Sequence, residues 1–397
     1  MKFICEKVLL ESAIAPLSRV VSTKATLPIL ENILVEVVSE GVRFAATDLE
    51  IGMKTQVPAK VEESGTVTIP ARVFFEVVSH LNEGLVEVQM DGETNMVQLK
   101  GEGFQYKFNI LSADGYPVLP ETPKETKISV NQDAFKKALR DVLFSASSPR
   151  EDNLIFTGVL LRLEKDNLTL VALDGHRLGK RIMKVSQGEL NRSVIVPAKA
   201  LNEVVKILKD TSDPVEIYFG DHQVVFKFDE TIFFTRLLEG QFPQFELIIP
   251  EKSETVLKVE KEVFLQALRR ASILAQDRES PRLIKMSLNG SQLVITANTQ
   301  DLGQAYEEIP VEVESVGEKS DITIGFNARY LIDALNALED EKVRFEFGQV
   351  KSPGVLRPES GGNDAIYVVM PIRPLGEVVS AEPKKEGRPL AAAGRSN

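Results

Sequence analysis

Three stretches of the chain, IPARVFFEVVSHL (69–81), VPAKALNEVVKIL (196–208) and FNARYLIDALNAL (326–338), share one pattern that decides the fold. The second stretch begins 127 residues after the first, and the third begins 130 residues after the second. Within each stretch apolar residues recur every three or four positions, which is the spacing of one face of an α-helix. The sequence therefore predicts the same amphipathic helix three times, at a nearly constant interval.

A second helical pattern repeats at the same interval. VNQDAFKKALRDV (130–142) matches VEKEVFLQALRRA (259–271), and CEKVLLESAIAPL (5–17) fits the same apolar positions. Pro16 lies inside the first copy, where it is expected to end or kink the helix. Alternating apolar runs between the helices predict antiparallel strands.

The repeats divide the chain into three similar units. We expect an α+β fold of three tandem domains, each with two amphipathic helices on antiparallel sheets, over residues 1–124, 125–252 and 253–375. Residues 376–397 are rich in Pro, Gly, Ala and charge, which predicts a disordered tail, and their last positions resemble an expression remnant. A duplication without geometric purpose is one interpretation. The alternative, which we favour, is an arc of three units that a second chain closes by symmetry.

The composition indicates a cytoplasmic chain without a metal or cofactor site. Of 397 residues one is cysteine, which can form neither an intrachain disulfide nor a zinc site. No apolar run is long enough to span a bilayer, and the N-terminus MKFICEKVLLESA carries charges where a signal peptide is apolar. The net charge of −11 argues against a surface that is basic throughout.

The basic residues nevertheless recur at matching helical positions. Arg72, Lys199 and Arg329 share one position in the first turn of the repeated helix, and further cations lie on the other helices. If these helices line one concave face, an acidic chain acquires a basic inner surface that would hold phosphates without reading bases. The alternative is that they are solvated side chains or members of local ion pairs.

The segment VALDGHRLGK (171–180) holds one of three histidines and admits three interpretations. It could be an enzyme site using His176 with Asp174, a structural turn, or part of a binding surface. Asp48 occupies the matching position of the first unit, and neither other copy has a histidine there. The sequence has no phosphate-binding, dinucleotide, zinc-protease or nucleophile-elbow motif, so we expect no catalytic residues and no enzyme. For the chain as a whole, a further alternative is a scaffold protein that does not bind DNA.

Several motifs in order along residues 1–375 resemble one family. They are TLPILENILVE (26–36), FAATDLEIGM (44–53), ALDGHRLGK (172–180), FPQFELIIP (242–250) and IYVVMPIRPL (366–375). Together with the repeated helices they resemble the bacterial sliding clamp, the β subunit of DNA polymerase III. The resemblance implies a DNA clamp fold and a head-to-tail homodimeric ring around duplex DNA, bound without sequence preference. It also implies a processivity factor without catalysis, which binds the polymerase α subunit, the clamp loader, other polymerases and repair proteins through short linear peptides.

The resemblance also assigns site residues. The peptide pocket between the second and third units would comprise Phe156, Leu173, Gly175, His176, Arg177, Leu178, Pro243, Leu247, Ile248, Val368, Val369, Met370, Pro371, Ile372 and Arg373. DNA contacts would come from Lys24 and Arg150, to which the repeat adds Arg72 and Lys199. The dimer interface would place Tyr106 and Phe108 on Ile273 and Leu274, with Lys100 or Lys107 facing Glu307 and Glu308. Leu173 departs from the family's frequent hydroxyl residue, and the family's usual end lies near Leu375.

Overall fold

The computed structural model describes residues 1–21, 27–91, 94–122, 126–148, 153–185, 191–276, 282–299, 301–317, 323–348 and 352–372. These residues form three units with the same order of elements. The tail beyond residue 375 lies outside the described residues. Among those described, no helix is both long enough and apolar enough to cross a membrane.

The elements of the three units follow one plan, a strand and a helix, then four or five strands with a second helix, then three strands. Unit I contains β1 Lys2–Glu6, α1 Lys7–Val20, β2 Asn32–Val38, β3 Gly41–Thr47, β4 Ile51–Val57, β5 Lys60–Glu63, β6 Gly65–Pro70, α2 Ala71–Ser79, β7 Leu85–Asp91, β8 Met96–Gly101 and β9 Phe104–Asn109. Unit II contains β10 Thr126–Asn131, α3 Gln132–Leu143, β11 Gly158–Glu164, β12 Asn167–Leu173, β13 Arg177–Lys184, β14 Asn191–Pro197, α4 Ala198–Ile207, β15 Pro214–Phe219, β16 Gln223–Phe228 and β17 Thr231–Arg236. Unit III contains β18 Thr255–Glu260, α5 Lys261–Ile273, β19 Leu283–Asn289, β20 Gln292–Thr299, β21 Gly303–Pro310, β22 Glu312–Ser315, β23 Thr323–Asn327, α6 Ala328–Ala337, β24 Lys342–Phe347, β25 Gly354–Pro358 and β26 Ala365–Val369.

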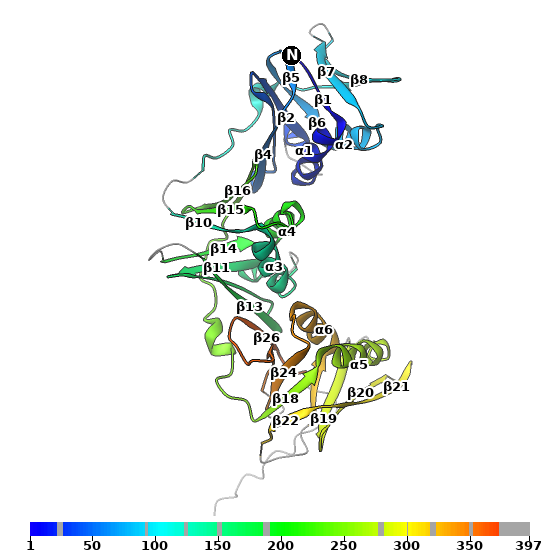
Figure 1. Cartoon of the computed structure of the whole chain (residues 1–397), viewed down its shortest axis with the longest axis vertical. Helices are drawn as coiled ribbons and strands as arrows, with labels where there is room; N and C mark the ends of the chain where they lie inside the picture. Colours follow the sequence, from blue (N-terminus) through cyan, green and yellow to red (C-terminus); the bar gives the residue numbers. More distant parts are fainter. Residues whose placement is uncertain are drawn as a thin grey trace, which may run out of the picture.

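The three units are stacked along the long axis of the molecule, and the helices α1 to α6 gather on one side (Figure 1). The helices bury their apolar faces on the sheets, with Phe74, Phe135 and Phe264 fully buried. The ends of the arc, marked by β8 and β21, project toward the helical side (Figure 1). The three-unit α+β architecture expected from the repeats is therefore confirmed, with the helices on a common concave side.

Neighbouring units share their sheets. The last strand of unit II, β17, pairs with β4 of unit I in an eight-stranded sheet. The last strand of unit III, β26, pairs with β13 of unit II in a nine-stranded sheet. At each internal junction the last strand of one unit therefore pairs with the third strand after the first helix of the preceding unit. This strand, which we call the hairpin strand, is β4 in unit I, β13 in unit II and β21 in unit III.

Two details of the helices differ from the sequence-based expectations. Each unit begins with a short strand, β1, β10 or β18, which the helical pattern concealed. Pro16 lies inside α1, which continues to Val20, so of the two expected effects, an end or a kink, the end is wrong. In unit III the Asn327 side chain caps α6, because its Oδ1 accepts a hydrogen bond from the Arg329 amide at 2.9 Å.

Candidate functional site

Residues 174–177, which we call the DGHR corner, form a hairpin turn between β12 and β13. Hydrogen bonds to the Asp174 side chain stabilise this turn. The Asp174 Oδ1 atom accepts hydrogen bonds from the amides of His176 and Arg177, both at 2.9 Å. Gly175 has a φ of +83°, a conformation that glycine adopts without strain. Asp48 holds the matching turn in unit I with bonds of 3.0 and 2.8 Å to the amides of Glu50 and Ile51. The aspartate is thus a turn residue in both units.

This geometry gives the enzyme interpretation no support. The Asp174 carboxylate is engaged by two amides and by the Arg177 guanidinium, at 3.0 Å from Nε. The His176 side chain is exposed, and no described side chain bonds to its ring. A general base needs such an orienting partner. Within the described ranges no group of three or more His, Cys, Asp or Glu is arranged to hold a metal ion.

Arg177 turns from the corner toward unit III and joins two units. Its Nη1 atom donates to Asp333 Oδ2 of α6 at 2.7 Å. Its guanidinium carbon lies 4.4 Å from the Tyr330 ring centroid and 5.5 Å from that of Phe144. Charge pairing and stacking at a side chain that is 13% exposed make Arg177 a link across the junction of units II and III.

An apolar cluster lies behind the corner, on the sheet face that points away from the helices. Its buried members come from both sides of the II/III junction: Leu160, Val171, Leu173, Leu178, Ile195, Phe245, Val355, Ile366 and Val368. Leu178 of β13 lies directly opposite Val368 of β26. Leu247 and Met370 stand beside this cluster with exposed fractions of 82% and 37%. The junction therefore presents exposed apolar side chains over a buried apolar floor, which suits a short apolar peptide.

Several of the expected pocket residues converge on this place. Phe156, in the 3₁₀-helix η3 Leu154–Thr157, lies 4.0 Å from where a Cβ on Gly175 would stand. The Met370 amide donates to the His176 carbonyl at 2.8 Å, which ties the end of β26 to the corner. Around it lie half-buried residues of the segment 241–250 and of the chain after β26: Pro243, Ile248, Pro371 and Ile372.

One expected pocket residue does not fit, and another cannot be placed. Val369 is 1% exposed and packs in the core of unit III, because alternation along β26 turns it toward the helices. Arg373 lies outside the described residues. Sequence reasoning missed Lys180, a half-buried residue of β13 on the same outer face, whose pKa burial lowers. The repeat could have indicated Lys180, because Lys54 is a lysine at the matching position of unit I.

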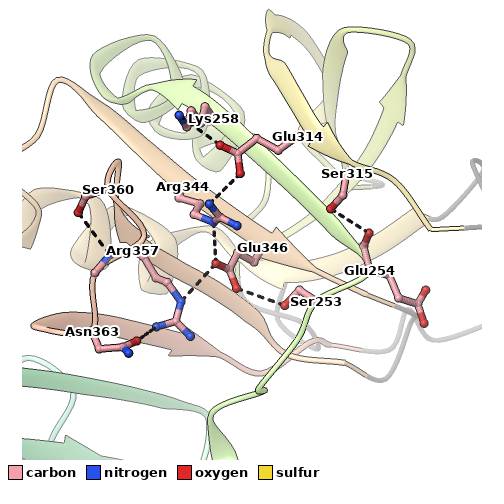
Figure 2. A network of polar contacts seen from close by, with 11 residues as sticks. Ser253, Glu254, Lys258, Glu314, Ser315, Arg344, Glu346, Arg357, Ser360 and Asn363 are labelled. Carbon is pink, nitrogen blue, oxygen red and sulfur yellow. Dashed lines mark hydrogen bonds and ion pairs between the residues drawn. The ribbon is translucent and has the colours of Figure 1, made fainter.

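A polar network holds the loop before β26 in place, as Figure 2 shows. Glu346 is 7% exposed and accepts from Arg344 Nε at 3.0 Å, pairs with Arg357 Nε at 3.2 Å and accepts from Ser253 at 3.4 Å. Arg357 in turn donates to Asn363 Oδ1 at 2.7 Å. The network links the segment between units II and III to the hairpin that carries β26, so it prepositions the last strand.

The concave side is more basic than the rest of the chain. The six α-helices of the described residues hold twelve lysines and arginines against seven aspartates and glutamates, whereas the whole chain holds 47 against 58. Arg72 and Arg140 are exposed and have no ion pair with a described residue. Lys199 is 68% exposed and lies 3.4 Å from Asp48 across the I/II junction. Lys24 and Arg150 lie outside the described residues.

Among the described strands, those at the two ends of the arc each have one unpaired edge. β9 ends the five-stranded sheet of unit I, and β21 ends the four-stranded sheet of unit III. Unpaired edges expose backbone donors and acceptors that pair readily with another strand. Near these edges Tyr106 is 43% and Ile273 63% exposed, and Leu274 is half-buried.

Two side chains at these ends already have partners in the same chain. Phe108 is 6% exposed and packs edge-to-face on Phe74 at 5.5 Å, so it belongs to the core of unit I. Glu307 accepts two hydrogen bonds from Arg270, at 2.8 and 2.7 Å, and these hold its pKa below the usual value. Lys107 and Glu308 are exposed, and Lys100 is half-buried.

Three family models match in series along the chain. They describe the N-terminal, central and C-terminal domains of the DNA polymerase III beta subunit, and they match residues 1–120, 129–244 and 246–373. The beta sliding clamp of Bacillus subtilis (strain 168) is 30% identical over 383 residues, covering 94% of this chain and 100% of that relative. The beta sliding clamp of Synechocystis sp. is 29% identical over 394 residues, covering 94% of this chain and 99% of that relative.

Solved structures agree. The crystal structure of the DNA polymerase sliding clamp from Bacillus subtilis matches with a TM-score of 0.88 at 30% identity, over 94% of this chain and 99% of that chain. A sliding clamp from Pseudomonas aeruginosa bound to griselimycin matches with a TM-score of 0.88 at 26% identity, also over 94% and 99%.

Proposed function

The chain belongs to the DNA polymerase III beta subunit family, the bacterial sliding clamps, and from this we propose that two copies close head to tail into a ring that slides on duplex DNA. Units I, II and III, with boundaries near residues 124 and 252, then form one half of the ring. The ring does no chemistry. It tethers a polymerase, and other proteins that act on DNA, by being trapped on the duplex.

The observation that carries this proposal is the repeated joint between units. β17 pairs with β4, and β26 pairs with β13, so two of the three last strands have partners in the chain. The remaining last strand is β9, and the remaining hairpin strand is β21. β9 pairs with β8 at one end of the arc, and β21 lies at the other end (Figure 1), so a second copy would have to supply each partner.

The internal joints also supply a register for closure. Phe233 lies opposite Met53 at one joint, and Tyr367 lies opposite Gly179 at the other. Aligning the units by their strand pairs places Tyr106 in the position of Phe233 and Tyr367, and Ala305 in that of Met53 and Gly179. We therefore expect Tyr106 opposite Ala305 of the second copy, with Lys107 opposite Gln304. In this register Glu307 faces Phe104, so neither Lys100 nor Lys107 is its direct partner.

Side-chain packing at the internal joint supports the apolar part of the expected interface. At the II/III junction Phe144, just after α3, lies 5.8 Å from the Tyr367 ring and packs against the core of unit III. The same two positions at the free ends are Ile273 and Tyr106. We expect Ile273 and Leu274 to cover Tyr106 of the second copy, while Phe108 supports the strand from inside unit I.

The basic concave side would face the DNA. Contacts from exposed cations such as Arg72 and Arg140 reach phosphates and carry no sequence information, which permits sliding. Lys199 would contribute although it neighbours Asp48, because it is largely exposed.

The II/III junction would bind short linear peptides of partner proteins. Apolar side chains of the peptide would cover Leu173, Leu178 and Val368 between Leu247 and Met370, while His176 and the backbone of the corner would orient it. Leu173 makes this floor more apolar than a hydroxyl residue would.

Topological retention tests the proposal. Protein that a clamp loader has placed on a nicked circular plasmid is expected to co-elute with the plasmid at 0.5 M or higher salt, because phosphate contacts are screened there and only encirclement holds it. Cutting the plasmid once should release it. Retention on the linear plasmid, or loss from the circle at the same salt, would contradict encirclement.

A further inference from the structure

The I/II junction carries a hollow on the same outer face as the apolar cluster of the II/III junction. Its volume is about 690 Å³, within the range of roughly 300–1,000 Å³ typical of ligand pockets. The floor comes from β2, β3, β4 and β17, and one wall comes from the segment 113–119 that leads from unit I to unit II. Val118 in this wall is 98% exposed. The hollow thus has an apolar wall open to solvent.

The two junctions match position by position. The outward residues Leu34, Ala45, Ile232 and Phe234 at the I/II junction take the places of Leu160, Val171, Ile366 and Val368 at the II/III junction. The connecting segments match too, because Tyr116-Pro117 stands 126 residues before Phe242-Pro243. A buried cluster of Ala45, Leu119, Val225 and Phe234 underlies the first junction. The I/II junction therefore repeats the architecture of the candidate peptide site.

A basic group that has no partner among the described residues lies in the floor of this hollow. Lys54 is half-buried between Ala45 and Ile232, its neighbours on the adjoining strands, and it makes no ion pair or hydrogen bond with any described residue. Lys180 holds the matching place at the II/III junction. A half-buried ammonium group in an apolar setting is stabilised by an anionic partner. The floor therefore favours a ligand that brings a carboxylate among apolar groups.

The other charged groups of the lining leave this preference in place. Asp229 is paired with Lys209 at 2.8 Å, and Arg43 donates to Gln56 at 3.1 Å. Glu36, Lys227 and Glu230 complete the charged lining. Glu36, Glu230, Lys227 and Lys54 then form no ion pair with any described residue. Of the two bases, only Lys54 lies at the centre of the apolar floor, between Ala45 and Ile232.

We propose that the I/II groove, defined as the hollow lined by Leu34, Ala45, Lys54, Ile232 and residues 116–119, is a second docking site for an extended peptide. The peptide carries an apolar side chain that packs against Ile232 and Val118, next to a carboxylate that pairs with Lys54. The choice of a peptide rests in part on the proposed peptide site at the II/III junction, because the two junctions share one architecture. One chain would then hold two client segments at once, one at each junction.

The experiment uses a random heptapeptide library displayed on phage, panned against the full chain carrying Met370→Asp, which closes the II/III site. We expect enrichment of peptides with an acidic residue beside a large aliphatic one. Synthesised with a fluorescein label, these should bind at least tenfold more weakly to a chain that also carries Lys54→Met, and with unchanged affinity to the matched Lys180→Met control. The chain with Lys54→Glu should also fail to bind these peptides, and it should bind versions in which the acidic residue is replaced by lysine.

Two outcomes overturn the inference. One is that no sequence is enriched on the Met370→Asp chain, and the other is that the enriched peptides bind the Lys54→Met chain as well as its control. Thermal unfolding of each variant shows whether the fold persists. Panning the same library on the Lys54→Met chain with Met370 intact tests the II/III site by itself, so enrichment there without enrichment on the Met370→Asp chain leaves the proposed function standing while this inference falls.

Discussion

Ile273 offers the most quantitative test of ring closure, because it is exposed in one chain and should be covered in the dimer. Complete burial of such a side chain contributes about 1.5–3 kcal/mol. Ile273 is 63% exposed, so covering it should contribute about 1–2 kcal/mol at one contact. A closed head-to-tail dimer contains the contact twice, which gives about 2–4 kcal/mol in total.

Replacing Ile273 with aspartate should remove this contribution from both contacts. Since about 1.4 kcal/mol corresponds to a factor of ten, the dimer should dissociate roughly 30- to 700-fold more readily. The carboxylate, buried against Tyr106 of the second copy, should weaken the dimer further, because an unpaired charge is costly to desolvate. Sedimentation velocity with fluorescence detection, from nanomolar to micromolar protein, measures the change.

The matched control is Leu85→Asp. Leu85 is 66% exposed, nearly the same as Ile273, but it begins β7 away from either free edge. We expect this variant to dimerise like the unmodified chain. The reasoning is refuted if Ile273→Asp dimerises as tightly as the control, or if both substitutions dissociate the dimer equally.

Three further expectations follow from individual contacts. Arg72→Glu and Arg140→Glu, made singly, should each weaken nonspecific binding to duplex DNA and reduce the salt dependence by about one ion, while Lys60→Glu, an equal change of charge on β5, should not. A filter-binding series in salt measures this, and identical slopes for the three variants would contradict the basic concave side. Arg177→Met should lower the free energy of unfolding by about 1.5–3 kcal/mol, because hydrogen bonds to Asp174 and Asp333 are lost, and a urea midpoint equal to that of the unmodified chain would refute its role as a link between units. Burial raises the pKa of the Cys5 thiol to about 12, from a usual value near 9, so unfolding releases a proton between these pH values and stability should fall as pH rises through them; the Cys5→Ala chain should lose up to about 1.4 kcal/mol less per pH unit there, and parallel curves for the two chains would show that the thiol is not held protonated.

Periodicity predicted the helices well because each one packs a single stripe on a sheet. The stretches 196–208 and 326–338 contain α4 and α6 nearly end to end. The strands β1, β10 and β18 were concealed because each has five or six residues and runs directly into a helix. The joints between units could not be predicted, since pairing between β17 and β4 joins residues that lie far apart in sequence and leaves no local signal.

The site residues divide in the same way. The corner around Asp174 was recognisable because its turn chemistry is local and recurs at Asp48. Val369 was misjudged because alternation along a strand shows two faces without saying which one a neighbouring helix covers. Phe108 lies on the same face as Tyr106, and it was misjudged because only the tertiary position of α2 buries Phe108 against Phe74 and leaves Tyr106 exposed. Lys54 and Lys180 were missed because a lysine in a strand usually indicates solvent, and only the shared sheets turn these two toward an apolar floor.

Closure of β9 on β21 is the central claim, and a cysteine cross-link tests it most directly. In the register taken from the internal joints, Lys107 lies opposite Gln304 of the second copy, and facing residues on antiparallel strands have Cα atoms about 4.5–5.5 Å apart, within disulfide range. The native Cys5 is 3% exposed and should therefore not form a cross-link. A chain with Lys107→Cys and Gln304→Cys should oxidise to a covalent dimer. The control chain carries Lys107→Cys and Glu308→Cys. Because Glu308 lies four residues beyond Gln304 on the same face of β21, this chain should stay monomeric on a denaturing gel. Equal cross-linking of the two pairs, or none for the first, would contradict the account.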